Sequence, residues 1–412
     1  MEVLRRHRWR VFLILFLFAA SLGRYEHKMP KRNFADFHVY YYTAQKLAQR
    51  ADIYDDNAYR QERVANFKYP PIVALVFYPF HVIPEHSAAV IWFCLNFIFI
   101  ILFFYWASVL VFDKEFSNKH KNLVYFLAVL FTLRFFMFNF DEGQVNFLMM
   151  AALTLSLFLI KRGKDLFSGV CLGFSCLVKY MTAIIAPYIL YKKKFKVFLY
   201  FVLAIFVFSM LPALVLGWDY NLSLQKSFFP FLCKTSLDFG SMSIHKNQSL
   251  VAMVTRFFSS FSEYSINVLS LDKFKIGFLV GLTCIFLYSL IFFPSRKLPD
   301  NNRLKRMADY GMLYICMALF NPNGWIHAFI FLVFPYMVCL YYLFKIKHQD
   351  LLAWILVFLS AAFCSWPDKL FIRSLEDSAE VYSFVTIGSL LLFCALCKIK
   401  FWPKEALESH AE

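Results

Sequence analysis

Long runs of apolar residues alternate with short polar segments over almost the whole chain. The longest of these runs reach about 18 to 26 residues, the length of helix that crosses roughly 30 Å of hydrocarbon at 1.5 Å per residue. We therefore expect an all-α, polytopic integral membrane protein, folded as a single membrane domain over residues 1–412. The pattern predicts about ten transmembrane helices, at residues 11–22, 88–112, 123–140, 144–160, 197–216, 276–293, 309–320, 325–344, 351–366 and 382–397.

Three further apolar segments do not fit a single full crossing. Residues 72–83 lie between two prolines, and a run of about a dozen residues indicates a re-entrant or interfacial piece. Residues 166–190 have basic clusters on both sides, which favours a hairpin of two short helices turning near Lys179 and Tyr180 over one crossing. Residues 248–261 predict an amphipathic helix that lies on an external surface.

Composition agrees with a membrane protein, since 60% of the residues are hydrophobic and 17% are charged, against about 45–50% and 25% in soluble proteins. The net charge of +16 arises from short basic clusters between the apolar runs, a distribution that orients membrane helices rather than one that binds nucleic acid. This distribution of basic clusters predicts that both termini lie on the cytoplasmic side and that two large loops, residues 24–71 and 217–274, lie on the other side. The ten cysteines show no metal-ligand spacing and are expected to be small buried hydrophobic residues.

The polar stretch at residues 34–71 holds the first candidates for chemistry. Asp36 opens a predicted helix in which Tyr40, four residues later, lies on the same face. The carboxylate either caps this helix by accepting a backbone N–H or, ionised in an external loop, takes a proton from a hydroxyl as a general base. Tyr41 and Tyr69 belong to the same loop and are candidate substrate-binding residues.

A second polar group lies between two predicted helices. Asp141 and Glu142 are adjacent carboxylates that either hold a divalent cation or lie solvated in a turn, and no histidine accompanies them. Gln144 and Asn146 begin the next predicted helix, where side-chain amides suit either sugar hydroxyls or contacts between helices.

Positive charge and amides gather at the predicted external helix. Lys246, Asn247 and Gln248 lie at its start, and Arg256 lies within it. A guanidinium at this place either binds phosphate through two hydrogen bonds or extends to lipid headgroups. The sequence favours neither alternative.

Three more residues lie within or beside predicted membrane helices. Trp325 is typical of an anchor at the membrane interface. His327, just inside the membrane, is costly to bury and therefore indicates a partner or a function. Lys179 carries the same cost, but we expect it toward the cytoplasm, where it stabilises the hairpin.

Taken in order along the chain, these residues form a set of motifs that covers roughly residues 34–330. The motifs are Asp36…Tyr40-Tyr41…Ala44, Ile53-Tyr54, Tyr69-Pro70-Pro71, Gly143-Gln144-Val145-Asn146, Gly169…Gly173…Lys179, Asn247-Gln248-Ser249-Leu250…Arg256 and Pro322…Trp325…His327. The set resembles the GT-C-fold glycosyltransferases that use polyprenyl-phosphate sugars. The most similar group is the bacterial one that contains the polyprenyl-phosphomannose-dependent α-mannosyltransferases.

The resemblance implies a GT-C-like fold with short re-entrant and external amphipathic helices, in the bacterial cytoplasmic membrane, with its active site on the periplasmic or extracellular side. It implies the transfer of one sugar, with inversion, from a polyprenyl-phosphate sugar to an acceptor hydroxyl of a lipid-linked or cell-envelope glycan. Asp36 would be the general base. The substrate-binding residues would be Tyr40, Tyr41, Tyr69, Gln144, Asn146, Lys246, Asn247, Gln248, Arg256, Trp325 and His327. Because the leaving group is already a phosphate, cationic side chains suffice, and no cofactor or obligatory metal is expected.

A transporter or flippase for a lipid-linked saccharide is the alternative function, because it too needs ionisable residues in a hydrophobic chain. Such proteins typically carry internal repeats and a binding site at mid-membrane. Here no repeat is visible and the polar residues gather on one face, which favours an enzyme.

Overall fold

The computed structural model describes residues 19, 22–23, 25–26, 35–55, 59–60, 64–235, 242–295, 298–299, 302–365 and 373–402. In this part of the chain the regular structure is helical and no strand occurs; one isolated bridge pairs Asn247 with Trp325. Six of the described helices are long and apolar enough to cross a membrane, and five shorter apolar helices have 10–17 residues. The expected all-α, polytopic membrane fold is therefore confirmed.

The predicted span at residues 11–22 lies almost wholly outside the described residues, whereas each other predicted span coincides with one helix or with consecutive helices. The elements of the first half are α3 (Ala35–Ala48), α5 (Pro71–Phe77), η1 (Tyr78–Val82), α6 (Glu85–Val111), α7 (Asn118–Glu142), α8 (Asn146–Lys161), α9 (Asp165–Val178), η2 (Tyr180–Ile184), α10 (Ile185–Tyr191), α11 (Phe195–Met210) and α12 (Ala213–Leu216). Those of the second half are α13 (Trp218–Thr235), α15 (Leu250–Phe258), α16 (Lys273–Phe292), α17 (Arg303–Phe320), η3 (Ile326–Leu332), α18 (Val333–Tyr341), η4 (Tyr342–Ile346), α19 (Leu351–Cys364), α20 (Arg373–Val381) and α21 (Phe384–Phe401).

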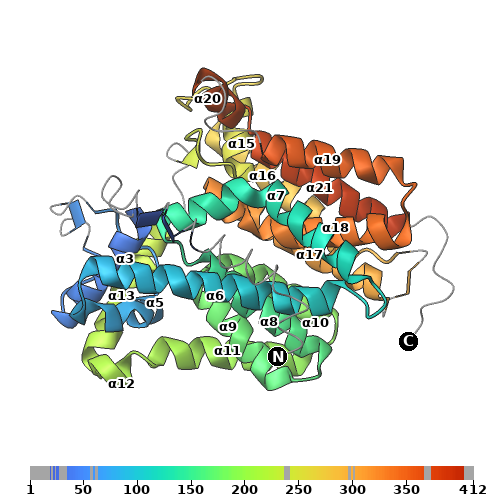
Figure 1. Ribbon diagram of the computed structural model, residues 1–412. Helices are drawn as coiled ribbons and strands as arrows, with labels where there is room; N and C mark the ends of the chain where they lie inside the picture. The colour runs from blue at the N-terminus through green and yellow to red at the C-terminus, as the bar shows by residue number, and fades with distance from the viewer. Residues whose placement is uncertain are drawn as a thin grey trace.

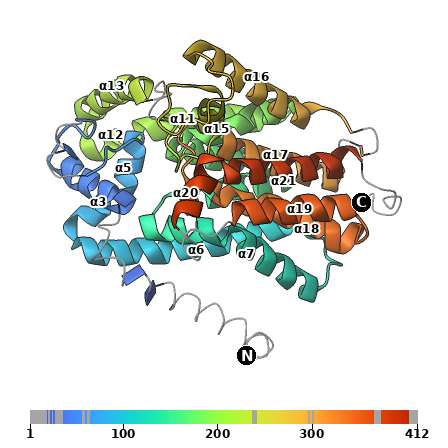
Figure 2. The same ribbon diagram turned by 90° about the horizontal axis from the view of Figure 1, so that it is seen from above.

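The helices form two groups (Figure 1). One group packs α6, α8, α9 and α11 in succession, and the other packs α17, α18, α19 and α21. Helix α7 joins them, because it contacts η3, α18 and α19 while its last turn leads into α8. The short helices α3 and α5 pack against each other at one end of the first group, and Figure 2 shows α16 along the outer edge of the molecule.

Residues 165–191 form the hairpin that the flanking charges predict. Helix α9 leads to Lys179, whose backbone is extended, and η2 with α10 returns. Lys161 before the hairpin and Lys192 after it line one small pocket, so the two basic clusters lie at the same end. The tip carries Lys179 into a cavity that Asp36 also lines. This corrects the expectation that Lys179 lies at the far end from Asp36 and serves only the hairpin.

Two glycines allow α9 to approach α11 closely. A Cβ on Gly169 would lie 2.5 Å from the Cβ of Tyr200, and a Cβ on Gly173 would lie 2.7 Å from the Cβ of Ala204. Small residues four positions apart on one face let two membrane helices pack backbone against backbone in this way. Helix α9, the first arm of the hairpin, is thereby fixed against α11.

Two helices extend beyond their predicted bounds to include charged residues. Helix α17 begins at Arg303 rather than residue 309, since the Asn302 side chain accepts hydrogen bonds from two backbone N–H groups of the first turn. Helix α21 continues past residue 397 to place the Lys400 ammonium 2.8 Å from the buried carboxylate of Asp309. The hydrophobic pattern alone does not predict these extensions, because it assigns the charged residues to the loops.

We predict that Gly173→Val lowers the free energy of unfolding by about 1–3 kcal/mol, because the added methyl groups overpack the contact with α11. Thermal unfolding of the detergent-solubilised protein measures this effect. Gly281→Val in α16 is the matched control, since a Cβ there has no atom within 4 Å. Equal loss of stability in both variants would show that the close contact does not matter.

Candidate active site

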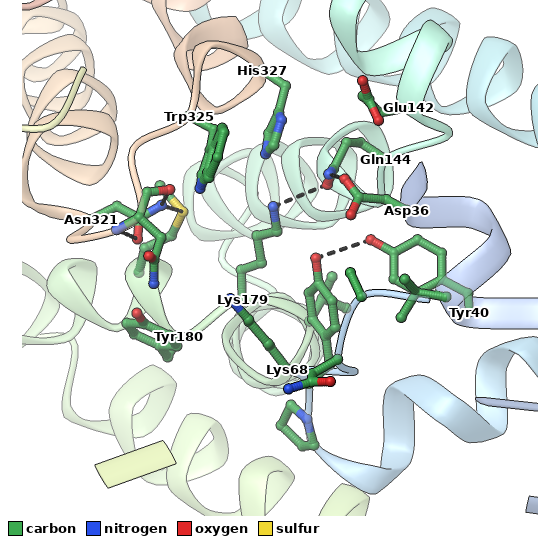
Figure 3. Close-up of a pocket in the computed structure, with 18 of the residues that line it drawn as sticks. Asp36, Tyr40, Lys68, Glu142, Gln144, Lys179, Tyr180, Asn321, Trp325 and His327 are labelled. Carbon is green, nitrogen blue, oxygen red and sulfur yellow. Dashed lines mark hydrogen bonds between the residues drawn. The ribbon is translucent and has the colours of Figure 1, made fainter. Parts of the chain in front are cut away.

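A cavity of about 770 Å³ lies where the two helix groups meet, and Figure 3 shows side chains that line it. It is bounded by α3, the segment before α5, the turn between α7 and α8, the tip of the hairpin, and the segment that leads into η3. The polar residues of its lining are Asp36, Tyr40, Asn66, Lys68, Tyr69, Glu142, Gln144, Lys179, Tyr180, Lys246, Asn321, Asn323, Trp325, His327 and Glu380.

Asp36 lies in the first turn of α3 and is positioned by its neighbour in the chain. Phe37 is fully buried against Gly143, whose φ of +63° lies in the left-handed region; a Cβ there would be 2.7 Å from the Cβ of Phe37. Trp92 Nε1 donates a hydrogen bond to the Gly143 carbonyl oxygen at 2.7 Å. These contacts fix the turn between α7 and α8 against α3, which brings the Asp36 carboxylate to the start of α8.

Asp36, Gln144 and Lys179 form a chain of hydrogen bonds (Figure 3). Gln144 Nε2 donates to the Asp36 carboxylate, and Gln144 Oε1 accepts from Lys179 Nζ at 3.2 Å. Burial raises the pKa of Asp36 above its ordinary value, while the positive charge of Lys179 and the hydrogen bond from Gln144 oppose this shift. The carboxylate is thus a stronger base than an exposed aspartate and remains stabilised by donors when ionised.

Two tyrosines form one wall of the cavity. The hydroxyl oxygens of Tyr40 and Tyr69 are 3.0 Å apart and share a hydrogen bond. Burial raises the pKa of both phenols, so they remain neutral. Tyr41 does not line the cavity; its hydroxyl donates to the carbonyl oxygen of Ile83 at 2.9 Å, which ties α3 to η1.

Trp325 and His327 face the hairpin tip from the start of η3 (Figure 3). The backbone carbonyl oxygen of His327 accepts hydrogen bonds from Asn139 Nδ2 at 2.8 Å and from Asn146 Nδ2 at 3.2 Å. Asn146 also donates to Asn139 Oδ1 at 2.8 Å. Asn146 therefore lies behind the lining and acts on the site by positioning the histidine.

Asn247 and Gln248 bind the backbone of residues 322–324, directly before Trp325 and His327. Asn247 Nδ2 donates to the carbonyl oxygen of Pro322 at 2.7 Å, and the Gln248 backbone N–H donates to that of Gly324 at 2.8 Å. Both side chains are buried and neither lines the cavity. The two residues thus position Trp325, with which Asn247 forms the isolated bridge.

Arg256 is also placed away from the cavity. Its side chain is fully buried, and burial lowers its pKa to about 10, so the guanidinium stays charged at neutral pH. At distances of 2.6–3.2 Å it donates hydrogen bonds to Ser383 Oγ and to the carbonyl oxygens of Ser243, Ile244, Asn247 and Val381. The guanidinium thus binds acceptors of the protein itself and does not line the cavity, which corrects the expectation that it binds a phosphate or lipid headgroups. Lys246, an exposed cation of the same segment, does line the cavity.

The sequence did not identify every charged residue of the lining. Lys68 directly precedes Tyr69 in a loop already assigned to the site, so its position in the sequence could have identified it as a lining residue. Glu142 was expected as a metal ligand or a solvated turn residue, and it lines the cavity beside Gln144. Glu380 was not predicted, because it lies in α20, between two predicted spans, where the sequence carries no motif.

The described residues contain one group of three side chains that could hold a metal ion, formed by His245, Asp377 and Glu380, whose ligand atoms lie within 4.8 Å of one another. Glu380 Oε1 already pairs with Arg134 Nη2 at 2.9 Å, which neutralises that carboxylate. The group does not include Asp36.

Comparison with known proteins agrees with this architecture. The model of glycosyltransferase family 87 matches residues 67–322, more than half of the chain. The polytopic fold with its polar cavity is therefore that of a membrane glycosyltransferase, and the protein belongs to glycosyltransferase family 87. The matched segment includes Gln144 and Lys179, whereas Asp36 and His327 lie outside it.

A similar protein is the polyprenol-phosphate-mannose-dependent alpha-(1-2)-phosphatidylinositol pentamannoside mannosyltransferase of Mycobacterium tuberculosis (strain CDC 1551 / Oshkosh). The two sequences are 24% identical over 345 residues, which is 82% of this chain and 73% of the relative. No solved structure matches the chain. The resemblance inferred from the motifs is thus confirmed at the level of the family.

We predict that Arg256→Met lowers the free energy of unfolding by about 3 kcal/mol or more, because buried carbonyl groups lose their donors. Lys246→Met should change it by less than about 0.5 kcal/mol, since the side chain is exposed. Thermal unfolding of the two purified variants separates the roles. A stable Arg256→Met protein would contradict the structural role assigned to this guanidinium.

Proposed function

We propose that the protein transfers one sugar, mannose or another hexose or a pentose, from a polyprenyl-phosphate sugar to a hydroxyl of a lipid-linked or cell-envelope glycan. The transfer would take place on the non-cytoplasmic face and invert the anomeric carbon, with Asp36 as general base. The observation that carries the proposal is the cavity in which Asp36 lies beside Gln144 and Lys179. The similar mannosyltransferase of Mycobacterium tuberculosis depends on polyprenol-phosphate mannose, which supports the choice of a polyprenyl-phosphate sugar as donor.

In this scheme the acceptor hydroxyl gives its proton to the Asp36 carboxylate while its oxygen attacks the anomeric carbon. The bond from that carbon to the phosphate oxygen breaks at the same time, and its electron pair leaves with the polyprenyl phosphate. A single displacement of this kind converts a β-linked donor into an α-glycoside. Gln144 holds the carboxylate in place through its amide, so the base enters the reaction already oriented.

The leaving phosphate needs positive charge rather than a proton. Lys68, Lys179 and Lys246 reach the cavity from three distant segments, and His327 lies on the same side as Trp325. Ammonium groups stabilise the charge that develops on the phosphate as the bond breaks. The lysines supply this charge, so the scheme requires no metal ion.

One part of the lining is apolar and suits the lipid part of such a donor. It is formed by side chains of α9, η2, α11 and α13, which are Leu177, Val178, Met181, Ile205 and Phe228. Burying a hydrocarbon chain against these side chains is favourable, at roughly 25 cal/mol per Å² of apolar surface. A polar centre with an apolar flank therefore fits a sugar phosphate carried on a polyprenol.

We predict that Asp36→Asn reduces sugar transfer by about 10²–10⁴-fold, because the amide cannot accept the acceptor proton. Transfer is measured in membranes that contain the natural acceptors and are supplied with radiolabelled polyprenyl-phosphomannose. Asp55→Asn, an exposed aspartate of the same loop outside the cavity lining, should retain wild-type activity. Full turnover by the Asp36 variant would rule out the base.

The pH profile gives a second test. A base must be ionised, so kcat/KM falls as pH drops through the pKa of Asp36. Gln144→Leu and Lys179→Met each remove an interaction that lowers this pKa, and the acidic limb should therefore move to higher pH in both variants. Lys246→Met should leave the limb in place, since this lysine is not among the groups that shift the pKa of Asp36. An unmoved limb in all three variants would contradict the assignment.

A further inference from the structure

A second, smaller pocket of about 420 Å³ lies at the other end of α8. Gln144 lies two residues before this helix and lines the cavity around Asp36, while Lys161 is the last residue of the helix and lines the second pocket. Sixteen residues of helix separate the two sites by roughly 24 Å. The second pocket therefore plays no part in the chemistry proposed for Asp36.

Four cations from three parts of the fold line this pocket. Lys161 ends α8, Lys192 and Lys194 follow α10, and Arg306 is the fourth residue of α17. No carboxylate is among the residues that line it. The nearby Asp309 is buried and already lies 2.8 Å from Lys400, so it compensates only part of this charge.

The four cations differ in whether their side chains have a partner among the described residues. Lys161 donates to the Val109 carbonyl oxygen at 2.7 Å, and Lys192 lies 3.8 Å from Asp309. Lys194 and Arg306, in contrast, make no side-chain hydrogen bond or ion pair within the described part of the chain. Like charges held together in a concave site repel one another, and a bound anion relieves this repulsion.

The pocket also offers a neutral donor. Tyr310 is only 4% exposed and lines the pocket, and its hydroxyl makes no hydrogen bond to another described residue. A guanidinium, flexible ammonium groups and a hydroxyl at one site match the acceptor oxygens of a phosphate group.

We propose that the pocket between α8, α10 and α17 binds a phosphate group, contributed either by the headgroup of an anionic phospholipid or by a soluble phosphate compound. Lys194, Arg306 and Tyr310 supply the free donors, and Lys161 and Lys192 complete the positive site. This inference does not depend on the transferase mechanism, because it concerns different residues at the opposite end of α8.

Full-length protein in phosphatidylcholine nanodiscs tests the proposal, with the thermal unfolding midpoint as readout, because a ligand that binds the folded state raises it. In one arm the fraction of phosphatidylglycerol in the disc is increased; in the other, sodium pyrophosphate is added to neutral discs. A rise in the first arm identifies a lipid headgroup as the source, and a rise in the second identifies a soluble phosphate. The Lys194→Gln/Arg306→Gln double variant should need about tenfold more ligand for the same rise.

The matched control is Lys193→Gln/Lys196→Gln, which removes the same charge from exposed residues that do not line the pocket. It should respond as wild type does. If the pocket double variant does not fold, Tyr310→Phe, which removes only the hydroxyl, replaces it and should also need more ligand. The proposal is overturned if neither arm raises the wild-type midpoint, or if pocket and control variants respond alike, since general surface charge would then explain the effect.

Discussion

A carboxylate buried in a largely apolar protein needs donors and positive charge close to it, and this requirement organises the structure around Asp36. Its partners come from two other places in the chain, Gln144 at the start of α8 and Lys179 at the tip of the hairpin. Bringing them together requires close backbone contacts, which two glycines allow. Phe37 packs directly against Gly143, and Gly173 lets α9 lie against α11. The geometry around Asp36 and the helix packing are therefore one arrangement, in which neither can change without the other.

Most other polar residues of the motifs hold backbone segments rather than face the cavity. Asn146 binds the carbonyl group of His327, and Asn247 binds that of Pro322. Arg256 does the same on a larger scale, with five hydrogen bonds that tie the segment before α15 to the end of α20. In a site assembled from distant loops, such supports keep the lining residues in place, so a motif can report on a site without containing the groups that touch the substrate.

The sequence predicted the fold well because hydrophobic length and basic clusters determine it directly. It also indicated Asp36, Gln144 and His327, which line one cavity, since polar residues in an apolar chain are rare enough to stand out. It misplaced Lys179 because the rule that puts lysines on the cytoplasmic side does not distinguish a clustered lysine from a solitary one. It could not resolve Arg256, because a guanidinium binds phosphate and backbone carbonyl oxygens with the same geometry, and only the fold decides which of them is near.

The shortness of the hairpin has a consequence for the surrounding bilayer. Helix α9 has 14 residues and rises only about 21 Å, less than the roughly 30 Å of a hydrocarbon core. If the basic ends of the hairpin lie at one headgroup plane, its tip ends several ångströms short of the opposite plane. The ammonium group of Lys179 at that tip would then lie below the level of the surrounding headgroups, in the cavity that Asp36 also lines. In the proposed reaction, a lipid-borne phosphate would move toward this ammonium group below the headgroup plane, or the leaflet would thin locally around the protein.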